Sequence, residues 1–185
     1  MRASVNKMVG VLNRFGSSLN TNTRQRILQA FVIPKVTFCL PVWGHVENKQ
    51  CAAMDHVLQR AARVVLHDKT ASLNRQTYDV TGLVSFALMT EWRCDIAVSA
   101  LLSRENTDSC LPPLLAAGSQ CSGRTTRSVA GRCFLIPKHA LTASQKCFFY
   151  AATKHWNNLP AKLTAIQCHK LFTTQLRNHF ITLLA

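Results

Sequence analysis

The segment over residues 47–66 repeats its apolar residues at the spacing of an α-helix. Its apolar positions follow the i, i+3, i+4, i+7 pattern and are Ala53, Met54, Val57, Leu58, Ala61, Ala62 and Val65. Gln59, Arg60 and Arg63 fall on the opposite side. Because residues three and four apart share one face of a helix, this pattern predicts an amphipathic helix. It is the clearest helix signal in the chain and indicates a mainly α fold.

A second helix is predicted to begin near Asn22, within a cluster of N-cap residues at positions 20–23. The apolar residues that follow at helical spacing are Ile27, Leu28, Phe31 and Val32. Pro34 is expected to end or kink this helix, because proline lacks the N–H donor. Residues 36–44 are apolar on nearly all sides, which predicts a buried element.

Two more amphipathic helices are predicted, over residues 83–104 and 168–184. The core stripe expected for the second comprises Leu171, Phe172, Leu176, Phe180 and Leu184. Between these helices, residues 109–123 contain a Leu-Pro-Pro-Leu segment and the start of a Ser-, Gly- and Thr-rich stretch, which predicts a linker. We therefore expect a helical, bundle-like part at 1–108. A small basic part at 124–185 is expected to be irregular or helical, with one short β-hairpin.

Charge is distributed unevenly along the chain. Lys and Arg number 22 against 8 Asp and Glu, which gives a net charge of +14 and a pI near 10.0. Every acidic residue lies between Glu47 and Asp108, so both ends of the chain are purely basic. Such an excess indicates a polyanionic partner. A ribosomal role, a membrane-surface role and an intramolecular acidic partner, in another part of the same protein, are the alternatives.

The C-terminal part combines basic with aromatic residues. Lys and Arg neutralise phosphates and exposed rings stack on unpaired bases when proteins bind single-stranded nucleic acid or RNA loops. Cations without any carboxylate among them predict RNA or DNA as the partner. The predicted nucleic-acid-binding residues are Arg124, Arg127, Arg132, Lys138, Lys146, Lys154, Lys170 and Arg177. Phe148, Tyr150 and Trp156 are predicted to be core residues, because exposed aromatic rings are costly.

No catalytic, cofactor or metal site is predicted. Polymerase and nuclease chemistry needs carboxylates that hold two metal ions about 4 Å apart, and the acidic residues here are scattered. The glycine-rich nucleotide-binding patterns and the Gly-x-Ser-x-Gly pattern are missing. His45, His56 and His67 recur every 11 residues. On a helix they would be about 16 Å apart, which is too far to share a metal ion.

The eight cysteines are spread along the chain without a Cys-x-x-Cys pair. No secretory signal precedes them, so we expect reduced, buried thiols in an intracellular protein of the nucleus or cytoplasm. No segment reaches 18 uncharged apolar residues, which argues against a transmembrane or membrane-bound protein.

Three segments, in order, resemble the region downstream of the polymerase core in non-LTR (LINE-like) retrotransposon reverse transcriptases. Residues 27–44 have an apolar helix, a proline and a Phe-Cys-Leu-Pro-Val-Trp-Gly ending, similar to the family's Tyr-Cys-x-x-Val-Trp-Gly. Residues 54–66 resemble the family's helix with a hydrophobe, an acid and Val-Gln-x-Arg-Ala-x-Arg. The third series is Thr126-Arg127-Ser128, Leu135-Ile136-Pro137-Lys138, Gln145-Lys146-Cys147-Phe148-Phe149-Tyr150 and Trp156-Asn157-Asn158-Leu159-Pro160.

This resemblance implies a thumb-like and post-thumb region that holds RNA template or target DNA. The catalytic acidic pair would belong to an upstream palm, and we expect this chain to lack both that palm and the family's endonuclease. The sequence departs from the family at Thr37 and Phe38, where Glu and Tyr are usual, and at residues 91–93, near a usual Arg-Arg. The expected function is a non-catalytic fragment of an RNA-directed DNA polymerase. The alternatives are a piece that completes a catalytic partner chain, a stand-alone helical nucleic-acid-binding protein and an inert transposon remnant.

Overall fold

The computed structural model describes residues 2–103, 134 and 147–184. Within these ranges 78% of the residues are helical, which confirms the predicted mainly α fold. The described ranges contain no strand and therefore no β-hairpin. None of the described helices is long and apolar enough to cross a membrane.

The chain divides into two compact units. Unit 1 comprises Met1–Leu40, Val46–Met89 and Ile181–Ala185, and unit 2 comprises Pro41–His45 and Thr90–Phe180. The predicted linker at 109–123 lies outside the described residues, so the predicted division into 1–108 and 124–185 stays a prediction. Segments from both sides of that linker belong to unit 2.

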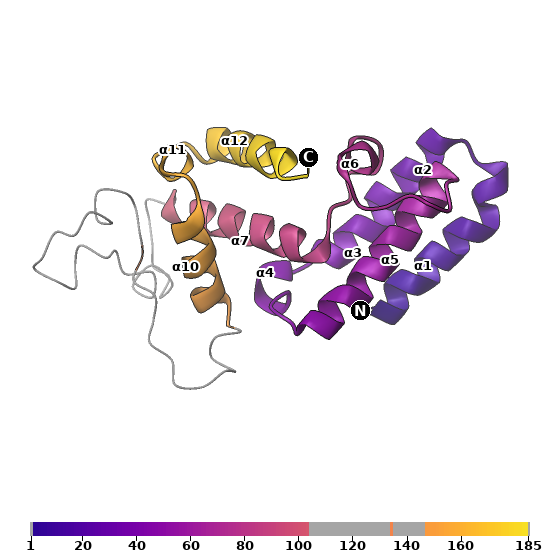
Figure 1. Ribbon diagram of the computed structural model, residues 1–185, viewed down its shortest axis with the longest axis horizontal. Helices are drawn as coiled ribbons and strands as arrows, with labels where there is room; N and C mark the ends of the chain where they lie inside the picture. The colour runs from indigo at the N-terminus through magenta and orange to yellow at the C-terminus, as the bar shows by residue number, and fades with distance from the viewer. Residues whose placement is uncertain (1, 104–133, 135–146, 185) are drawn as a thin grey trace, which may run out of the picture. The chain divides into compact units, whose positions relative to one another are not determined.

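Unit 1 is a helical bundle in which α1 and α5 lie side by side (Figure 1). Its elements are α1 (Arg2–Phe15), the short 3₁₀ turn η1 (Gly16–Ser18), α2 (Thr21–Ile27), the π-helical turn η2 (Leu28–Val32), α3 (Ile33–Thr37), α5 (Asn48–Leu66) and α6 (Arg75–Thr81). Three of the described helices cross the boundary between the units, namely α4 (Leu40–Trp43), α7 (Phe86–Leu102) and α12 (His169–Thr182).

The core of unit 1 forms between the apolar sides of α5 and α1. The helix predicted at 47–66 is confirmed, and its buried residues are Met54, Val57, Leu58, Ala61, Ala62 and Val65. Ala53, which was predicted to lie on this stripe, is only partly buried. On α1, Val5, Val9 and Leu12 are buried at the same helical spacing. Burial of each such side chain contributes about 1.5–3 kcal/mol to folding.

The helical run from residue 21 to 37 passes through Pro34 without ending. Its first turn is capped by Asn20, whose Oδ1 accepts a hydrogen bond of 2.8 Å from the Thr23 amide. Proline lacks an N–H and its ring crowds the carbonyl four residues earlier. The wider π turn of η2 comes immediately before α3, in which Pro34 is one of the first residues. We attribute the continued helix to this change of geometry.

The prediction of a buried element at 36–44 is wrong for Phe38, Cys39 and Val42, which are exposed. Val36 and Leu40 are completely buried, whereas Phe38 and Val42 are each 70% exposed. The helix breaks between α3 and α4, where Cys39 adopts the left-handed conformation with φ 49°. The apolar composition of this segment therefore includes side chains that face solvent.

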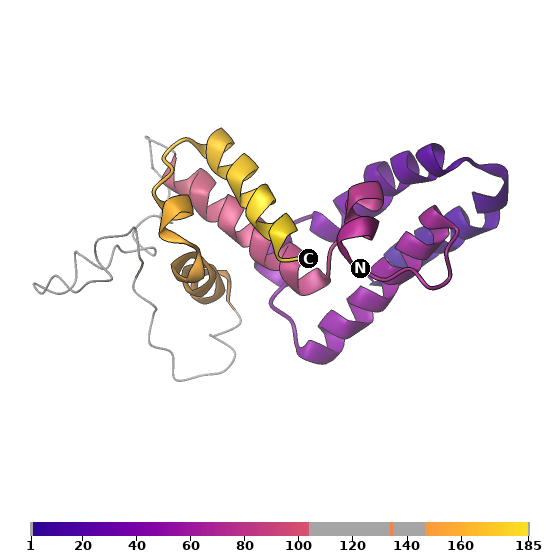
Figure 2. The ribbon, with the colours of Figure 1, turned by 45° about the horizontal axis from the view of Figure 1, so that its top comes forward.

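Unit 2 packs α10 (Phe148–Asn158), α11 (Ala161–Thr164) and α12 (His169–Thr182) with most of α7. Figures 1 and 2 both show α7 and α12 side by side. The predicted core residue Trp156 is buried, stacks on Phe172 with ring centroids 5.3 Å apart and contacts Phe134 at 6.0 Å. Phe148 and Tyr150, also predicted as core, are only partly buried.

The helix predicted at 168–184 is present as α12, and its stripe is partly corrected. Phe172, Leu176 and Phe180 are buried as expected. Leu171 is 52% exposed, because it is one residue, or about 100° of helix rotation, away from Phe172. Leu184 lies beyond the end of α12 and is only partly buried.

The helix predicted at 83–104 is present as α7, although Arg104 lies outside the described residues. Its amino end is fixed by Asp55, whose Oδ1 accepts a hydrogen bond of 2.6 Å from the Phe86 amide. A carboxylate at this end is favourable, because the first N–H groups of a helix have no partner inside it.

Candidate nucleic-acid interface

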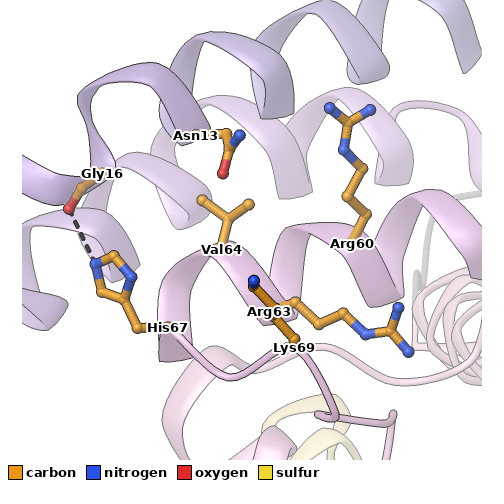
Figure 3. A pocket seen from close by; sticks show the side chains of 7 residues that line it. All are labelled: Asn13, Gly16, Arg60, Arg63, Val64, His67 and Lys69. Atoms are coloured by element: carbon orange, nitrogen blue, oxygen red, sulfur yellow. Dashed lines mark hydrogen bonds between the residues drawn. The ribbon is translucent and has the colours of Figure 1, made fainter.

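A hollow of about 310 Å³ with a cationic lining lies on unit 1 (Figure 3). It is lined by Asn13, Gly16, Arg60, Arg63, Val64, His67 and Lys69 and is called the basic hollow below. The residues come from α1, η1, α5 and the segment after α5. Three permanent cations around one concave surface attract anions such as phosphate groups.

The periodicity of α5 places two of these cations. Val57, Leu58 and Ala61 are buried, so Arg60 and Arg63 fall on the exposed side, as the sequence predicted. The Nε of Arg63 donates a hydrogen bond of 3.1 Å to the Ala71 carbonyl. This bond holds the guanidinium and leaves its outer N–H groups for other acceptors.

His67 closes one end of the basic hollow. It terminates α5 in the left-handed conformation, with φ 55°. Its Nε2 lies 3.1 Å from the Gly16 carbonyl oxygen, as the dashed line in Figure 3 shows. Since a carbonyl oxygen only accepts, Nε2 donates the hydrogen bond in this contact.

A fourth cation, Arg24, lies buried beside the end of α5. Only 4% of its surface is exposed, and a Cβ added at Gly16 would lie 3.8 Å from its Cδ. Its Nη1 donates to the Val64 carbonyl at 2.9 Å, and its Nη2 donates to Thr21 Oγ1 at 3.3 Å. A positive charge at the carboxyl end of α5 complements the helix dipole. Arg24 thus adds positive potential from beneath the hollow.

One carboxylate, that of Asp68, stands in the same segment. It accepts hydrogen bonds from the Thr70 hydroxyl at 2.6 Å and the Thr70 amide at 2.8 Å. These bonds, with a smaller effect of Arg63, hold the pKa of Asp68 below its ordinary value. Asp68 is therefore ionised at neutral pH and offsets only one of the four cations at the basic hollow.

A second hollow of about 290 Å³ continues the basic surface between α1 and α5. It is lined by Arg2, Asn6, Ala53, His56, Val57 and Arg60. Because Arg60 lines both hollows, the two follow one another along α5. From Ala53 to His67 the surface extends about 21 Å at 1.5 Å per residue. This equals the rise of about six base pairs.

The residues predicted to bind nucleic acid fall into two groups. Arg124, Arg127, Arg132, Lys138 and Lys146 lie outside the described residues. Lys154 on α10 and Lys170 and Arg177 on α12 are exposed in unit 2. Lys170 and Arg177 are seven residues apart, so they share one side of α12. The prediction for this set remains a prediction.

A cluster of titratable groups lies inside unit 2. The Cys94 Sγ is 3.4 Å from His45 Nε2, and the His45 ring stacks on His155 at 6.3 Å. Burial lowers the pKa of both histidines. Burial also raises the pKa of the Cys94 thiol to about 12. The Cys94 thiol is therefore protonated at neutral pH. Cys94 and His45 thus lack the thiolate that a cysteine nucleophile requires.

Asp95 is the most deeply buried acidic residue among those the structure describes, with 1% of its surface exposed. Its Oδ1 has no hydrogen-bond partner within these residues. Burial, with a smaller effect of Glu91, raises the pKa of its carboxyl group to about 8. Asp95 is thus neutral in the folded protein at pH 7.

Metal ligands and disulfides are not found in the described parts of the chain. Nowhere in them do three or more His, Cys, Asp or Glu side chains come together as a metal site would require. The five cysteines in these parts are free thiols. Only Cys94 of these five is buried, and Cys39 and Cys168 are exposed, so the expectation of buried thiols is wrong for most of them.

No family model, curated protein or solved structure matches the chain.

Proposed function

We propose that this chain is a non-catalytic region of a retrotransposon RNA-directed DNA polymerase that binds the backbone of RNA or DNA without sequence specificity. The observation that carries the binding proposal is the basic hollow, where Arg60, Arg63 and Lys69 surround a concave surface above the buried Arg24. The family assignment rests on the three resembling segments of the sequence.

The chemistry of the hollow favours phosphate over base recognition. Its lining contains three cations, a histidine and an asparagine, and no Phe, Tyr or Trp ring. Phosphate contacts position a nucleic acid without reading its sequence, whereas stacked rings and base-edge contacts would be needed for single-strand platforms or for specificity. The expected ligand is therefore the sugar–phosphate backbone.

Synthesis would require a palm domain with its own acidic pair, and such a domain is the protein partner that this proposal implies. RNA template or target DNA is the nucleic-acid partner. A chain with these partners acts inside the cell, in the nucleus or the cytoplasm.

The test is the salt dependence of binding to a single-stranded RNA of random sequence, measured by fluorescence anisotropy. For single strands, the logarithm of the binding constant falls with the logarithm of salt concentration by about 0.7 per phosphate neutralised. Replacing Arg60 and Arg63 together by Ala removes two contacts and should reduce the magnitude of that slope by about 1.4.

The matched control is Lys49→Ala with Arg75→Ala, which removes two exposed cations of unit 1 outside the basic hollow. This variant has the same net charge and should largely keep the wild-type slope. Slopes reduced by the same amount in the two double variants would show that total charge, and not the hollow, determines binding. An unchanged slope in both would place the interface elsewhere in the chain.

A further inference from the structure

A second surface of unit 1 has the opposite chemistry. A groove of about 600 Å³ lies between α1 and the run formed by α2 and η2, and its lining is almost entirely apolar. The lining residues of this apolar groove are Lys7, Met8, Val11, Leu12, Phe15, Ser18, Leu19, Ile27, Phe31 and Val32. Its volume lies within the range of about 300–1,000 Å³ that is typical of binding sites.

The walls of the groove are unusually exposed for large apolar side chains. Val11 is 52% exposed, Phe15 61% and Phe31 57%, while Leu12 and Val32 beneath them are buried. Isolated exposed apolar residues are ordinary, but a contiguous concave patch of them marks a surface that binds another apolar surface. Phe31 lies on the π-helical turn η2, and π turns inside helices are frequent at functional sites.

The charges around the groove define its occupant. Its lining belongs to residues 7–32, inside the acid-free segment 1–46. Lys7 lines the groove, and Arg14, seven residues later, lies on the same side of α1 and is exposed. Lys35 donates a hydrogen bond of 2.8 Å to Ser4 Oγ, so a further cation joins α3 to α1. The floor of the groove is apolar, and the only charged side chains of residues 1–46 are cations. This combination favours a ligand that is apolar at its centre and acidic at its edges.

The shape favours a helix as that ligand. The α1 wall has 14 residues and is about 21 Å long, which equals the length of a helix of about four turns. A helix in a groove inserts apolar anchors at i, i+3 or i+4, and i+7 and leaves its flanks to the rim. We propose that the apolar groove binds an amphipathic helix of a partner protein, with apolar anchors on one side and Asp or Glu along its flanks.

A second copy of this chain fits the groove less well. A symmetric dimer through this surface would bring two acid-free, cationic segments against each other, which like charges oppose. Phosphates also gain little from the groove, because most of its lining offers them no hydrogen-bond donor. The inference is therefore independent of nucleic-acid binding at the basic hollow.

The test uses the full chain and synthetic 14-residue helical peptides as probes. One peptide carries Leu anchors with Glu flanks, and its match carries the same anchors with Lys flanks. Fluorescence anisotropy should show that the chain binds the Glu peptide at least about tenfold more tightly than the Lys peptide. Equal affinities for the two peptides would overturn the inference.

The surface is located with two matched variants of exposed apolar residues. Phe15→Ser with Phe31→Ser should weaken binding of the Glu peptide by about tenfold or more. Phe38→Ser with Val42→Ser, outside the groove, should leave that affinity unchanged. Phe15→Ser with Phe31→Ser should keep wild-type binding to RNA. Loss of peptide binding and loss of RNA binding therefore test the groove and the proposed function separately.

Two other results would overturn the inference. If replacing Arg60 and Arg63 by Ala weakened binding of the Glu peptide as much as the two groove substitutions, the peptide would be held by the basic hollow. If sedimentation analysis showed a dimer that Phe15→Ser with Phe31→Ser dissociates, the occupant would be a second copy of the chain.

Discussion

Unit 1 and unit 2 place their ionisable groups in opposite ways. In unit 1 the cations of the basic hollow are exposed, and the buried Arg24 is hydrogen-bonded through Nη1 and Nη2 at the end of a helix, although its Nε has no partner within the described residues. In unit 2 the carboxyl group of Asp95 is buried with an unpaired oxygen, and burial also shifts the pKa values of Cys94, His45 and His155. The exposed charges of unit 1 are therefore accessible to an anionic ligand, whereas the buried groups of unit 2 are expected to make folding depend on pH.

The largest expected effect that separates the units is the loss of Trp156. Replacing it by Ala should destabilise unit 2 by about 3–5 kcal/mol, because the ring is buried between Phe134 and Phe172. All three tryptophans belong to unit 2, so urea unfolding followed by the fluorescence of Trp43 and Trp92 reports on this unit.

The matched substitution in unit 1 is Leu58→Ala, which removes a fully buried side chain of α5. This substitution should lower the urea midpoint of unfolding measured by circular dichroism. The midpoint measured by tryptophan fluorescence should fall by less. If both substitutions shifted both signals equally, the units would unfold together and the comparison would fail.

An intermediate effect is expected when Asp95 becomes Asn. Between the ordinary Asp pKa of 3.8 and the folded value of about 8, the folded protein holds a proton that the unfolded chain has lost. The free energy of unfolding contributed by this group therefore falls as pH rises through that window. The Asn variant cannot ionise, so its stability relative to wild type should increase from pH 4 to pH 8, by a few kcal/mol in total.

Urea unfolding of both proteins at pH 5, 6, 7 and 8 measures this difference. Taking the difference removes the opposite effect of His45 and His155, whose lowered pKa values reduce stability as pH falls below about 6.5 in both proteins. A difference that stays constant with pH would mean that Asp95 is ionised in the folded protein.

The smallest effect is expected from Asp68→Asn, the exposed counterpart of the Asp95 substitution. Asn keeps an oxygen that can accept the hydrogen bonds from Thr70, so the fold of the segment should persist. Loss of the negative charge should strengthen RNA binding roughly two- to threefold at low salt. Anisotropy titrations at two salt concentrations measure this gain, and weaker binding by the variant would contradict the role of the basic hollow.

The periodicity of apolar residues was sufficient to predict some of the helices. The helix at 47–66 was predicted because its apolar residues recur without interruption, and the same pattern placed Arg60 and Arg63 on the exposed side. The helix α1 was not predicted, although Val5, Val9 and Leu12 have the same helical spacing. The apolar residues Phe38 and Val42 were assigned to the interior because composition does not show where a helix breaks.

The basic hollow could be predicted only in part. The acid-free stretches predicted binding residues near the end of the chain, whereas the cations of α5 lie in the segment that also contains all eight acidic residues. Asn13 and Lys69 reach the hollow through tertiary packing, and Arg24 binds a carbonyl 40 residues away. Contacts of this range depend on how helices pack and leave no local pattern.

The position of α1 between the core, the basic hollow and the apolar groove has a consequence for sequence variation. Val9 is buried in the core, Asn13 lines the basic hollow and Phe15 lines the apolar groove. Neighbouring positions of one short helix are therefore constrained by different contacts. Gly10 is an exception, since a Cβ built there meets no atom within 4 Å. In a deep mutational scan, the buried and lining positions of α1 should therefore tolerate few replacements, whereas Gly10 should accept Ala.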